Sequence, residues 1–329
     1  MTHIPVAHSL FETQALATIV GERYDIGTIS SFDLYRSYVN DVYRVETSSG
    51  ATYFLKVARR AWRTLDDIGW DVALQQHLRR HRVSVSEPIP QRDGDPVCVL
   101  DAPEGSRGAV LYAETAGIKP QPPITPELYE VVGRGTARMH KVLDHFDAPT
   151  PRPGRTVQWL IDRSGAIVAA SLDAGDKNRR FVEHFSQRLG ADVEARVPAL
   201  DWGVCHGDMT LDNITIDRDG TVWFFDFDLA APAWRASEPS GIYTWAVEEP
   251  SVLPLWNAYL VGYRMERPFG EHEEAAVPSF AAAYDLWDLA HELEHWRHWS
   301  GRWRTTPRIV RERIDRLRTW AERLGFPPP

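Results

Sequence analysis

Several common features are scarce in this chain of 329 residues, and each scarcity narrows the class of protein. Its two cysteines, Cys98 and Cys205, are too few for the disulfide framework of a small secreted domain. No apolar run approaches the roughly 20 residues that a membrane-spanning helix needs. Residues 1–20 lack the basic stretch followed by an apolar stretch that marks a signal peptide. We therefore expect a cytoplasmic protein with no membrane partner.

Basic residues are also in deficit, because 37 Lys and Arg face 46 Asp and Glu for a formal net charge of −9. A negative chain is poorly suited to a phosphate backbone, so we expect no nucleic-acid partner. With 43% hydrophobic residues the chain can bury a substantial core, and its length suggests about two domains or lobes.

The order of expected elements divides the chain into two lobes. Residues 41–58 hold β-forming residues on both sides of a Ser-Ser-Gly turn, which predicts a strand pair. Thr64 and two following aspartates predict the start of a helix over 65–80. Beyond a Pro-rich stretch, helical periodicity dominates to the end of the chain. We predict an α+β bilobal protein.

The lobe boundaries follow from this change in character. We expect a small β-rich lobe for nucleotide binding over residues 1–112 and a hinge at 113–117. A larger, mainly helical lobe over 118–329 is expected to carry the catalytic and acceptor-binding groups. A ligand cleft between two such lobes is the ordinary expectation.

The stretch VCHGDMTLDNITIDRDGTVWFFDFDLA, residues 204–230, is the most informative in the chain. A carboxylate in a loop, such as Asp208, can orient or deprotonate a hydroxyl nucleophile. The amide of Asn213 and the carboxylate of Asp226 supply the oxygen ligands that Mg²⁺ prefers. An oriented nucleophile, a metal and a cation on the nucleotide are the parts that phosphoryl transfer needs.

The required cation is expected on a strand, next to a helix that bears a carboxylate. Lys56 lies in the expected strand TYFLKVA, and Asp71 follows fifteen residues later in the expected helix. Each residue alone is unremarkable, since strand lysines are mostly solvated. Their order along the chain, together with H-x-D-x-x-x-x-N and D-F-D, predicts a kinase.

These motifs resemble those of the phosphotransferase family that includes aminoglycoside phosphotransferases, choline kinases, type II homoserine kinases and the bacterial stress-response kinase. The resemblance covers about residues 28 to 300, and HGDMTLDN is its most specific part. SYVNDVYRVET resembles the segment that covers the phosphates, and LYAETAG resembles the linker that holds adenine. The resemblance implies a protein-kinase-like fold with ATP and Mg²⁺ as cofactors.

The resemblance also implies a role for each matching residue. Asp208 would be the catalytic base, and Asn213 and Asp226 would hold Mg²⁺. Lys56 would contact the α- and β-phosphates. The remaining nucleotide-binding positions would be Asp71 as the partner of Lys56, Ser37 and Asn40 in the phosphate-covering hairpin, and the backbone of Ala113 and Thr115 at the adenine.

The chain departs from the family pattern in three places. Asp71 stands where the family mostly has Glu, so its ion pair with Lys56 needs a closer helix or a bridging water. No glycine occurs between Ser30 and Val45, so phosphate closure must use other backbone groups. After D-F-D, the run Ala233–Glu238 keeps only the Trp and Arg of the relatives.

The acceptor is the least determined part of the sequence prediction. Eleven acidic residues lie between 238 and 294 against two arginines, in the region that builds the acceptor pocket of related folds. This excess favours a small amine-bearing hydroxyl compound, with Glu238, Glu249 and Asp228 as candidate contacts. Asp228 could equally be a second metal ligand or a structural acceptor, and we favour the structural role. The acidic run could also be a solvated face, as could the Arg-rich side of a helix expected over 307–324.

Three alternative functions are open at this stage. One is a Ser/Thr protein kinase of the stress-response type, and another is a nucleotide-binding regulator without turnover. The third is a zinc hydrolase, because HELEH at 291–295 matches H-E-x-x-H. The segment around it reads as an ordinary amphipathic helix, which favours packing over metal binding.

Overall fold

The computed structural model describes residues 4–60, 62–296 and 302–327, which form two compact units. The first unit contains the chain up to Lys119 together with His145–Pro151 and Ile214–Asp228. The second contains Pro120–Asp144, Arg152–Asn213 and the chain from Leu229 onward. Our predicted boundary had assigned everything after residue 117 to one lobe.

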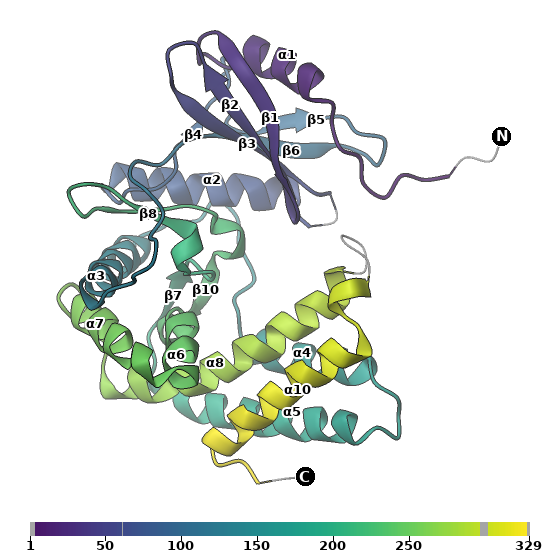
Figure 1. Cartoon of the computed structure of the whole chain (residues 1–329), viewed down its shortest axis with the longest axis vertical. Helices are drawn as coiled ribbons and strands as arrows, with labels where there is room; N and C mark the ends of the chain where they lie inside the picture. The colour runs from purple at the N-terminus through teal and green to yellow at the C-terminus, as the bar shows by residue number, and fades with distance from the viewer. Residues whose placement is uncertain (1–3, 61, 297–301, 328–329) are drawn as a thin grey trace. The chain divides into compact units, whose positions relative to one another are not determined.

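A six-stranded antiparallel sheet forms the body of the first unit (Figure 1). Its central path runs β1-β2-β3-β6-β4, and β5 pairs with β6. The strands are β1 (Ile29–Ser37), β2 (Asn40–Thr47), β3 (Thr52–Ala58), β4 (Pro88–Ile89), β5 (Cys98–Leu100) and β6 (Arg107–Ala113). The expected strand pair around residues 48–50 is the β2–β3 hairpin.

The two helices of this unit contribute to different apolar clusters. Helix α1 (Thr13–Arg23) packs with alternate sheet residues that include Leu55 and Val57. Helix α2 (Leu65–Arg80) contributes to a second cluster that includes Val110, the residue paired with Lys56 across β3 and β6. Because successive strand side chains point to opposite faces, Lys56 leaves the sheet on the α2 side. Because side chains alternate along β3, Lys56 lies outside the apolar cluster that contains α1.

A short hairpin completes the first unit. It consists of β8 (Ile214–Ile216) and β9 (Val222–Phe224), around the turn predicted at Asp219 and Gly220. Backbone bridges join Ile216 to Ile118 and Phe224 to Val85. These bridges explain why the D-F-D segment belongs to the first unit although it follows residues 206–213, which belong to the second.

The second unit is mainly helical, as expected (Figure 1). Its longer helices are α3 (Pro126–Leu143), α4 (Arg163–Ala170), α5 (Lys177–Arg196), α6 (Ser240–Glu248), α7 (Leu253–Arg264), α8 (Glu271–His291) and α10 (Pro307–Arg323). Helix α3 packs against α7, where Gly133 and Gly262 allow the backbones to approach closely. An added Cβ at Gly133 would lie 2.1 Å from the carbonyl oxygen of Tyr259, so this contact requires glycine.

Two short antiparallel strands in the second unit flank residues 206–213, named the catalytic loop here after the role predicted for Asp208. They are β7 (Trp202–Cys205) and β10 (Ala231–Trp234). The loop begins at His206, directly after β7, and ends in a 3-10 turn over Leu211–Asn213. In the part of the chain that the structure describes, no helix has the length and apolarity to cross a membrane.

Candidate active site

The first unit holds a cation between two carboxylates. Lys56 Nζ lies 2.6 Å from an oxygen of Asp226 and 2.6 Å from an oxygen of Asp228. Asp226 follows β9 and has a φ of +65°, in the left-handed region that aspartate tolerates better than most residues. This turn places both carboxylates of D-F-D on Lys56.

The three charges stabilise one another. Burial alone would lower the pKa of Lys56, but the carboxylates of Asp226 and Asp228 raise it above its ordinary value. Burial alone would raise the pKa of Asp228, but Lys56, Arg63 and Asn40 lower it to about 2. Lys56 is therefore an ammonium at neutral pH, which suits contact with phosphate oxygens.

Ser37 ends β1 and Asn40 begins β2, so both flank the tip of the hairpin in which the family resemblance placed them. The side-chain amide of Asn40 donates a 2.6 Å hydrogen bond to Asp228. The Ser37 hydroxyl donates a 2.6 Å hydrogen bond to Asp41, whose buried carboxylate also pairs with Arg107 at 2.6 Å. Through Asn40, the hairpin is tied directly to the D-F-D segment.

The other residues predicted to bind nucleotide are Asp71, Ala113 and Thr115. Asp71 is buried on α2, and its pairing with Lys56 stays a prediction. The backbone N–H of Ala113 donates to the carbonyl of Glu87, and its C=O accepts from Ser86 Oγ at 2.9 Å. The N–H of Ala113 is therefore occupied within the sheet, whereas its carbonyl oxygen has a second lone pair, and the adenine contact stays a prediction. Thr115, beyond the end of β6, stays a candidate.

The second unit holds the catalytic loop, and Asn213 braces its central carboxylate. The side-chain amide of Asn213 donates to the Asp208 backbone oxygen at 2.9 Å and to its carboxylate at 2.8 Å. Since both amide protons point at Asp208, the side-chain oxygen of Asn213 keeps its acceptor capacity. The five-residue spacing of D-x-x-x-x-N thus closes a local loop.

Gly207 is required by the shape of this loop. Its φ is +79°, and an added Cβ would lie 2.3 Å from the carbonyl oxygen of Leu229. Both conditions exclude a side chain at this position. The close approach explains in physical terms why glycine separates His206 from Asp208.

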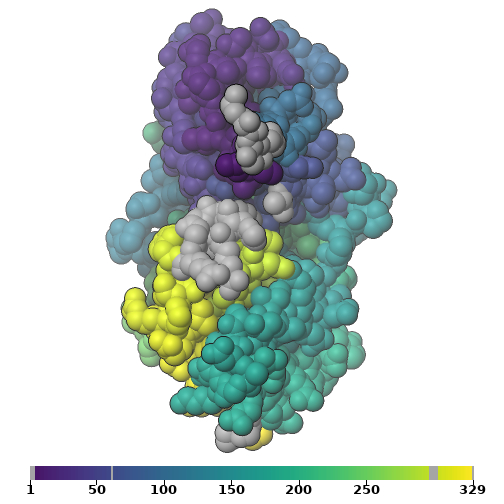
Figure 2. Space-filling view, turned by 90° about the vertical axis from the view of Figure 1, so that its right-hand side faces the viewer, coloured from purple at the N-terminus to yellow at the C-terminus, as the bar shows by residue number. Residues whose placement is uncertain are grey.

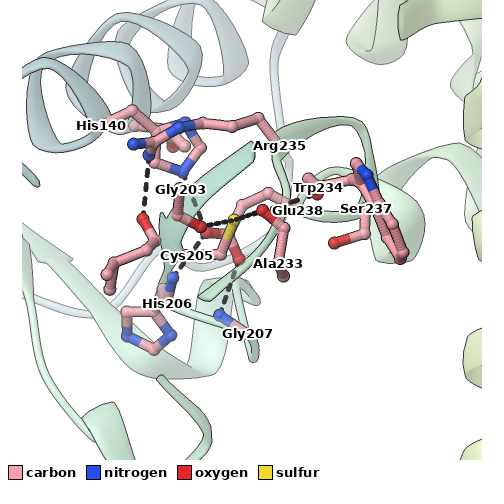
Figure 3. Close-up of polar contacts among 12 residues, drawn as sticks. His140, Gly203, Cys205, His206, Gly207, Ala233, Trp234, Arg235, Ser237 and Glu238 are labelled. Atoms are coloured by element: carbon pink, nitrogen blue, oxygen red, sulfur yellow. Dashed lines mark hydrogen bonds and ion pairs between the residues drawn. The ribbon is translucent and has the colours of Figure 1, made fainter. Parts of the chain in front are cut away.

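Glu238 anchors the backbone that leads into Asp208 (Figure 3). Its buried carboxylate accepts the backbone N–H of His206 at 2.6 Å and that of Gly207 at 2.8 Å. We had predicted an acceptor contact for Glu238, whereas the structure buries it beneath the loop. Sequence reasoning missed the anchor because any of the acidic residues after D-F-D could have supplied it.

His140 supplies a further hydrogen bond to the same carboxylate (Figure 3). Its Nε2 lies 3.1 Å from Glu238, and its Nδ1 lies 2.7 Å from the Tyr263 hydroxyl. Because a carboxylate only accepts, we assign the imidazole proton to Nε2, and Tyr263 then donates to Nδ1. Burial lowers the pKa of His140 to about 4, so the ring is neutral at pH 7.

Arg155 supports the other side of the loop, and no motif pointed to it. This buried guanidinium donates to the backbone carbonyl of Gly207 at 3.1 Å and to that of Leu229. It also donates to the Tyr284 hydroxyl at 2.7 Å. The peptide groups around Gly207 are therefore bound from both sides, with Glu238 on the N–H groups and Arg155 on the carbonyls.

We expect Glu238→Gln to lower kcat with little change in KM and to destabilise the fold at pH 7. Glutamine must place an amide N–H₂ where the loop presents donors, which costs roughly 1–3 kcal/mol. Burial would raise the pKa of Glu238, but the His140 hydrogen bond and charge, His206 and the Gly207 amide lower it to about 2, from 4.5. Its contribution is therefore full above pH 4.5 and is lost as the pH falls toward 2.

Urea unfolding of both proteins across this pH range measures the effect. The stability difference between wild type and Glu238→Gln should shrink as the pH drops below 4.5. Glu194→Gln, at an exposed position of α5, is the matched control and should track wild type throughout. A difference that is constant with pH would show that Glu238 is not a buried carboxylate.

Much of the acidity after D-F-D is paired within the second unit. Arg313 lies 2.6 Å from Asp288, and Arg316 lies 2.8 Å from Asp285. Both arginines belong to α10, which lies beside α5 on the face shown in Figure 2 and also contacts α8. The two charge runs thus pair in part with each other, so neither is simply a solvated face. Glu249 remains exposed.

The HELEH segment is part of the packing between α8 and its neighbours. The His291 ring stacks on Trp287, and Glu292 is buried near Arg304 at 3.1 Å. Among the residues that the structure describes, the only cluster of three potential metal ligands is His140, Cys205 and Glu238. The two histidines of H-E-x-x-H therefore have no third ligand in that part of the chain.

The residues described in each unit are those expected of a phosphotransferase that acts on hydroxyl groups, and comparison with known proteins supports that class. The model of the phosphotransferase enzyme family APH matches residues 35–276. The chain belongs to this family. The resemblance inferred from HGDMTLDN is confirmed, and the protein is a kinase with an alcohol group as acceptor.

Two curated relatives cover most of the chain. An uncharacterized protein of Deinococcus radiodurans is 34% identical over 290 residues, which are 86% of this chain and 82% of that protein. A homoserine kinase of Xanthobacter autotrophicus is 28% identical over 278 residues, with 83% of each chain covered.

Solved structures confirm the kinase-like α+β fold. A microcompartment-associated aminopropanol kinase has a TM-score of 0.75 at 22% identity, with 95% of this chain and 97% of that chain covered. An amicoumacin kinase in complex with AMP-PNP and Ca²⁺ also has a TM-score of 0.75, at 18% identity, covering 95% of this chain and 94% of that chain. At these identities the likeness establishes the fold alone.

Proposed function

We propose that this kinase transfers the γ-phosphate of ATP, with Mg²⁺, to the hydroxyl of a small amine-bearing acceptor. The observation that carries the amine is the exposed carboxylate of Glu249, directly after α6, since the neighbouring Glu248 already pairs with Arg316 at 3.2 Å. The same helix starts two residues after Glu238, the anchor of the catalytic loop. An ammonium group is the complement of such a carboxylate. Relatives named as aminopropanol and homoserine kinases support a small acceptor of this kind.

In this proposal the chain's own residues divide the work. Asp208, steadied by Asn213, orients the acceptor hydroxyl and receives its proton. Lys56 contacts the α- and β-phosphates as an ammonium. The chain from His206 to Asp208 is held by Glu238, so the carboxylate of Asp208 is positioned before the acceptor arrives.

The donor set fits a hard divalent cation. Asn213 keeps an amide oxygen for coordination, and Asp226 offers a carboxylate that is partly exposed. Oxygen donors of these two kinds are the usual protein ligands of Mg²⁺. The metal, when bound with nucleotide, would neutralise charge on the phosphates.

An acceptor screen with an ADP-coupled assay tests the proposal. We expect amino alcohols to be phosphorylated, and N-acetylation of the amine to lower kcat/KM about 10- to 100-fold, since a charge-assisted hydrogen bond contributes roughly 1.5–3 kcal/mol. The control is each acceptor at matched concentration without ATP. Equal rates for the free and acetylated amines would contradict the amine. Phosphorylation confined to a protein serine or threonine would contradict the small acceptor.

A further inference from the structure

A cavity of about 230 Å³ lies within the second unit, against the catalytic loop. Met209, Thr210 and Leu211, the three residues that follow Asp208, form one of its walls. The backbone N–H of Thr210 donates to the carbonyl of Asp208 at 3.0 Å, so this wall is part of the same tight loop. The wall of the cavity therefore belongs to the same loop as Asp208, the group proposed to receive the proton of the acceptor hydroxyl.

The remaining walls are mainly apolar and aromatic. Ile242 and Trp245 come from α6, Tyr129 comes from α3, and Tyr259 comes from α7. Among the described residues that line the cavity, none carries a charge. A charged group would lose its hydration there without gaining an ionic partner, whereas an apolar group would gain by leaving water.

One carboxylate nevertheless lies at the edge of this cavity. The indole N–H of Trp245 donates to a carboxylate oxygen of the exposed Glu249 at 3.1 Å. Glu249 also accepts the Ser251 hydroxyl at 2.9 Å. A carboxylate is thereby held at the indole nitrogen of Trp245, a residue that lines the cavity.

We propose that the cavity binds an apolar arm of the acceptor, of about the size of a phenyl ring, while the ammonium of the acceptor pairs with Glu249. This inference rests on the proposed function and narrows its substrate class to amino alcohols with a hydrophobic substituent. The arm contributes affinity by burial, at about three- to fourfold in kcat/KM for each methylene removed from water.

Gly241 provides a way to fill the cavity without disturbing the fold. It lies in α6 and lines the cavity, and an added Cβ would meet only the backbone oxygen of Met209, at 3.9 Å. A larger side chain is therefore accommodated by the protein and occupies space that the arm would use. Replacing a helical glycine also favours the helix. Gly69 in α2, where an added Cβ meets nothing within 4 Å, is the matched control.

The test compares two acceptors that share one amino-alcohol head, 1-amino-2-propanol and 2-amino-1-phenylethanol. In wild type and Gly69→Leu, kcat/KM should be at least about tenfold higher for the phenyl compound. Gly241→Leu should abolish this advantage while 1-amino-2-propanol is turned over as in wild type. Equal kcat/KM for the two acceptors in wild type, with turnover intact, would overturn the cavity proposal and leave the amine proposal standing.

Failure of the proposed function gives a different pattern. If neither compound nor any other amino alcohol is phosphorylated, the acceptor class is wrong. Calorimetric titration of 2-amino-1-phenylethanol without nucleotide then decides the cavity. Binding that Gly241→Leu weakens at least tenfold, and Gly69→Leu does not, supports the site. No binding, or binding unchanged by Gly241→Leu, overturns it.

Discussion

Replacing Asp208 by Asn is expected to lower kcat roughly 10²- to 10⁴-fold and to leave nucleotide affinity close to wild type. The range is the usual contribution of a positioned acid or base. Asparagine keeps a side-chain oxygen that can accept from Asn213, so the 2.8 Å contact has a replacement and the loop should fold. An ADP-coupled assay and calorimetric titration of ADP measure the two quantities.

Asp212→Asn is the matched control for this change. Asp212 lies four residues further along the same loop, and its side chain is exposed. The same loss of charge there should leave kcat within a few-fold of wild type. An Asp208→Asn enzyme with normal turnover would exclude Asp208 as the group that receives the proton. A parallel loss in both variants would indicate a general effect of loop charge.

Replacing Lys56 by Met is expected to lower kcat about 10²- to 10³-fold and to weaken nucleotide binding. The range is that for removal of one preorganised donor from a transition state with developing charge. The substitution also leaves the carboxylates of Asp226 and Asp228, each 2.6 Å from the lost ammonium, without their shared cation. Asp228, whose pKa of about 2 depends on Lys56, should then titrate at higher pH.

Two further variants separate the causes of this loss. Lys56→Arg keeps the positive charge and should retain more nucleotide affinity than Lys56→Met. Lys177→Met, on an exposed residue of α5, should behave as wild type. ADP dissociation constants and the pH dependence of urea unfolding are the measurements. Unchanged ADP binding in Lys56→Met would show that Lys56 serves only to hold D-F-D.

Structural features that depend on neighbouring residues could be predicted from the sequence. The predicted helix over 65–80 is α2, because Thr64 and Asp67 form a reciprocal capping box within one turn. The hairpin around Gly220 also formed as predicted, since its turn needs a residue with positive φ. In both places the determining contacts lie within a few residues of one another.

Contacts between residues far apart in the sequence could not be predicted from it. Nothing in the pattern of the acidic residues distinguished Glu238, which anchors His206 and Gly207, from Glu249, which is exposed. Nor did the sequence show that the backbone N–H of Ala113 donates to the carbonyl of Glu87 in the sheet. Pairing of this kind depends on which segments the fold brings together.

The sequence by itself determined the family, which its motifs identify. It also determined the local loop that joins Asp208 to Asn213, because the two residues are only five positions apart. Only the tertiary structure decided which acidic residues are buried anchors, which are neutralised by α10, and where an uncharged cavity lies beside the catalytic loop. A carboxylate has the same residue type whether it is solvated, paired or buried. Its surroundings, supplied by distant parts of the chain, set its hydration and its pKa, and thereby its role.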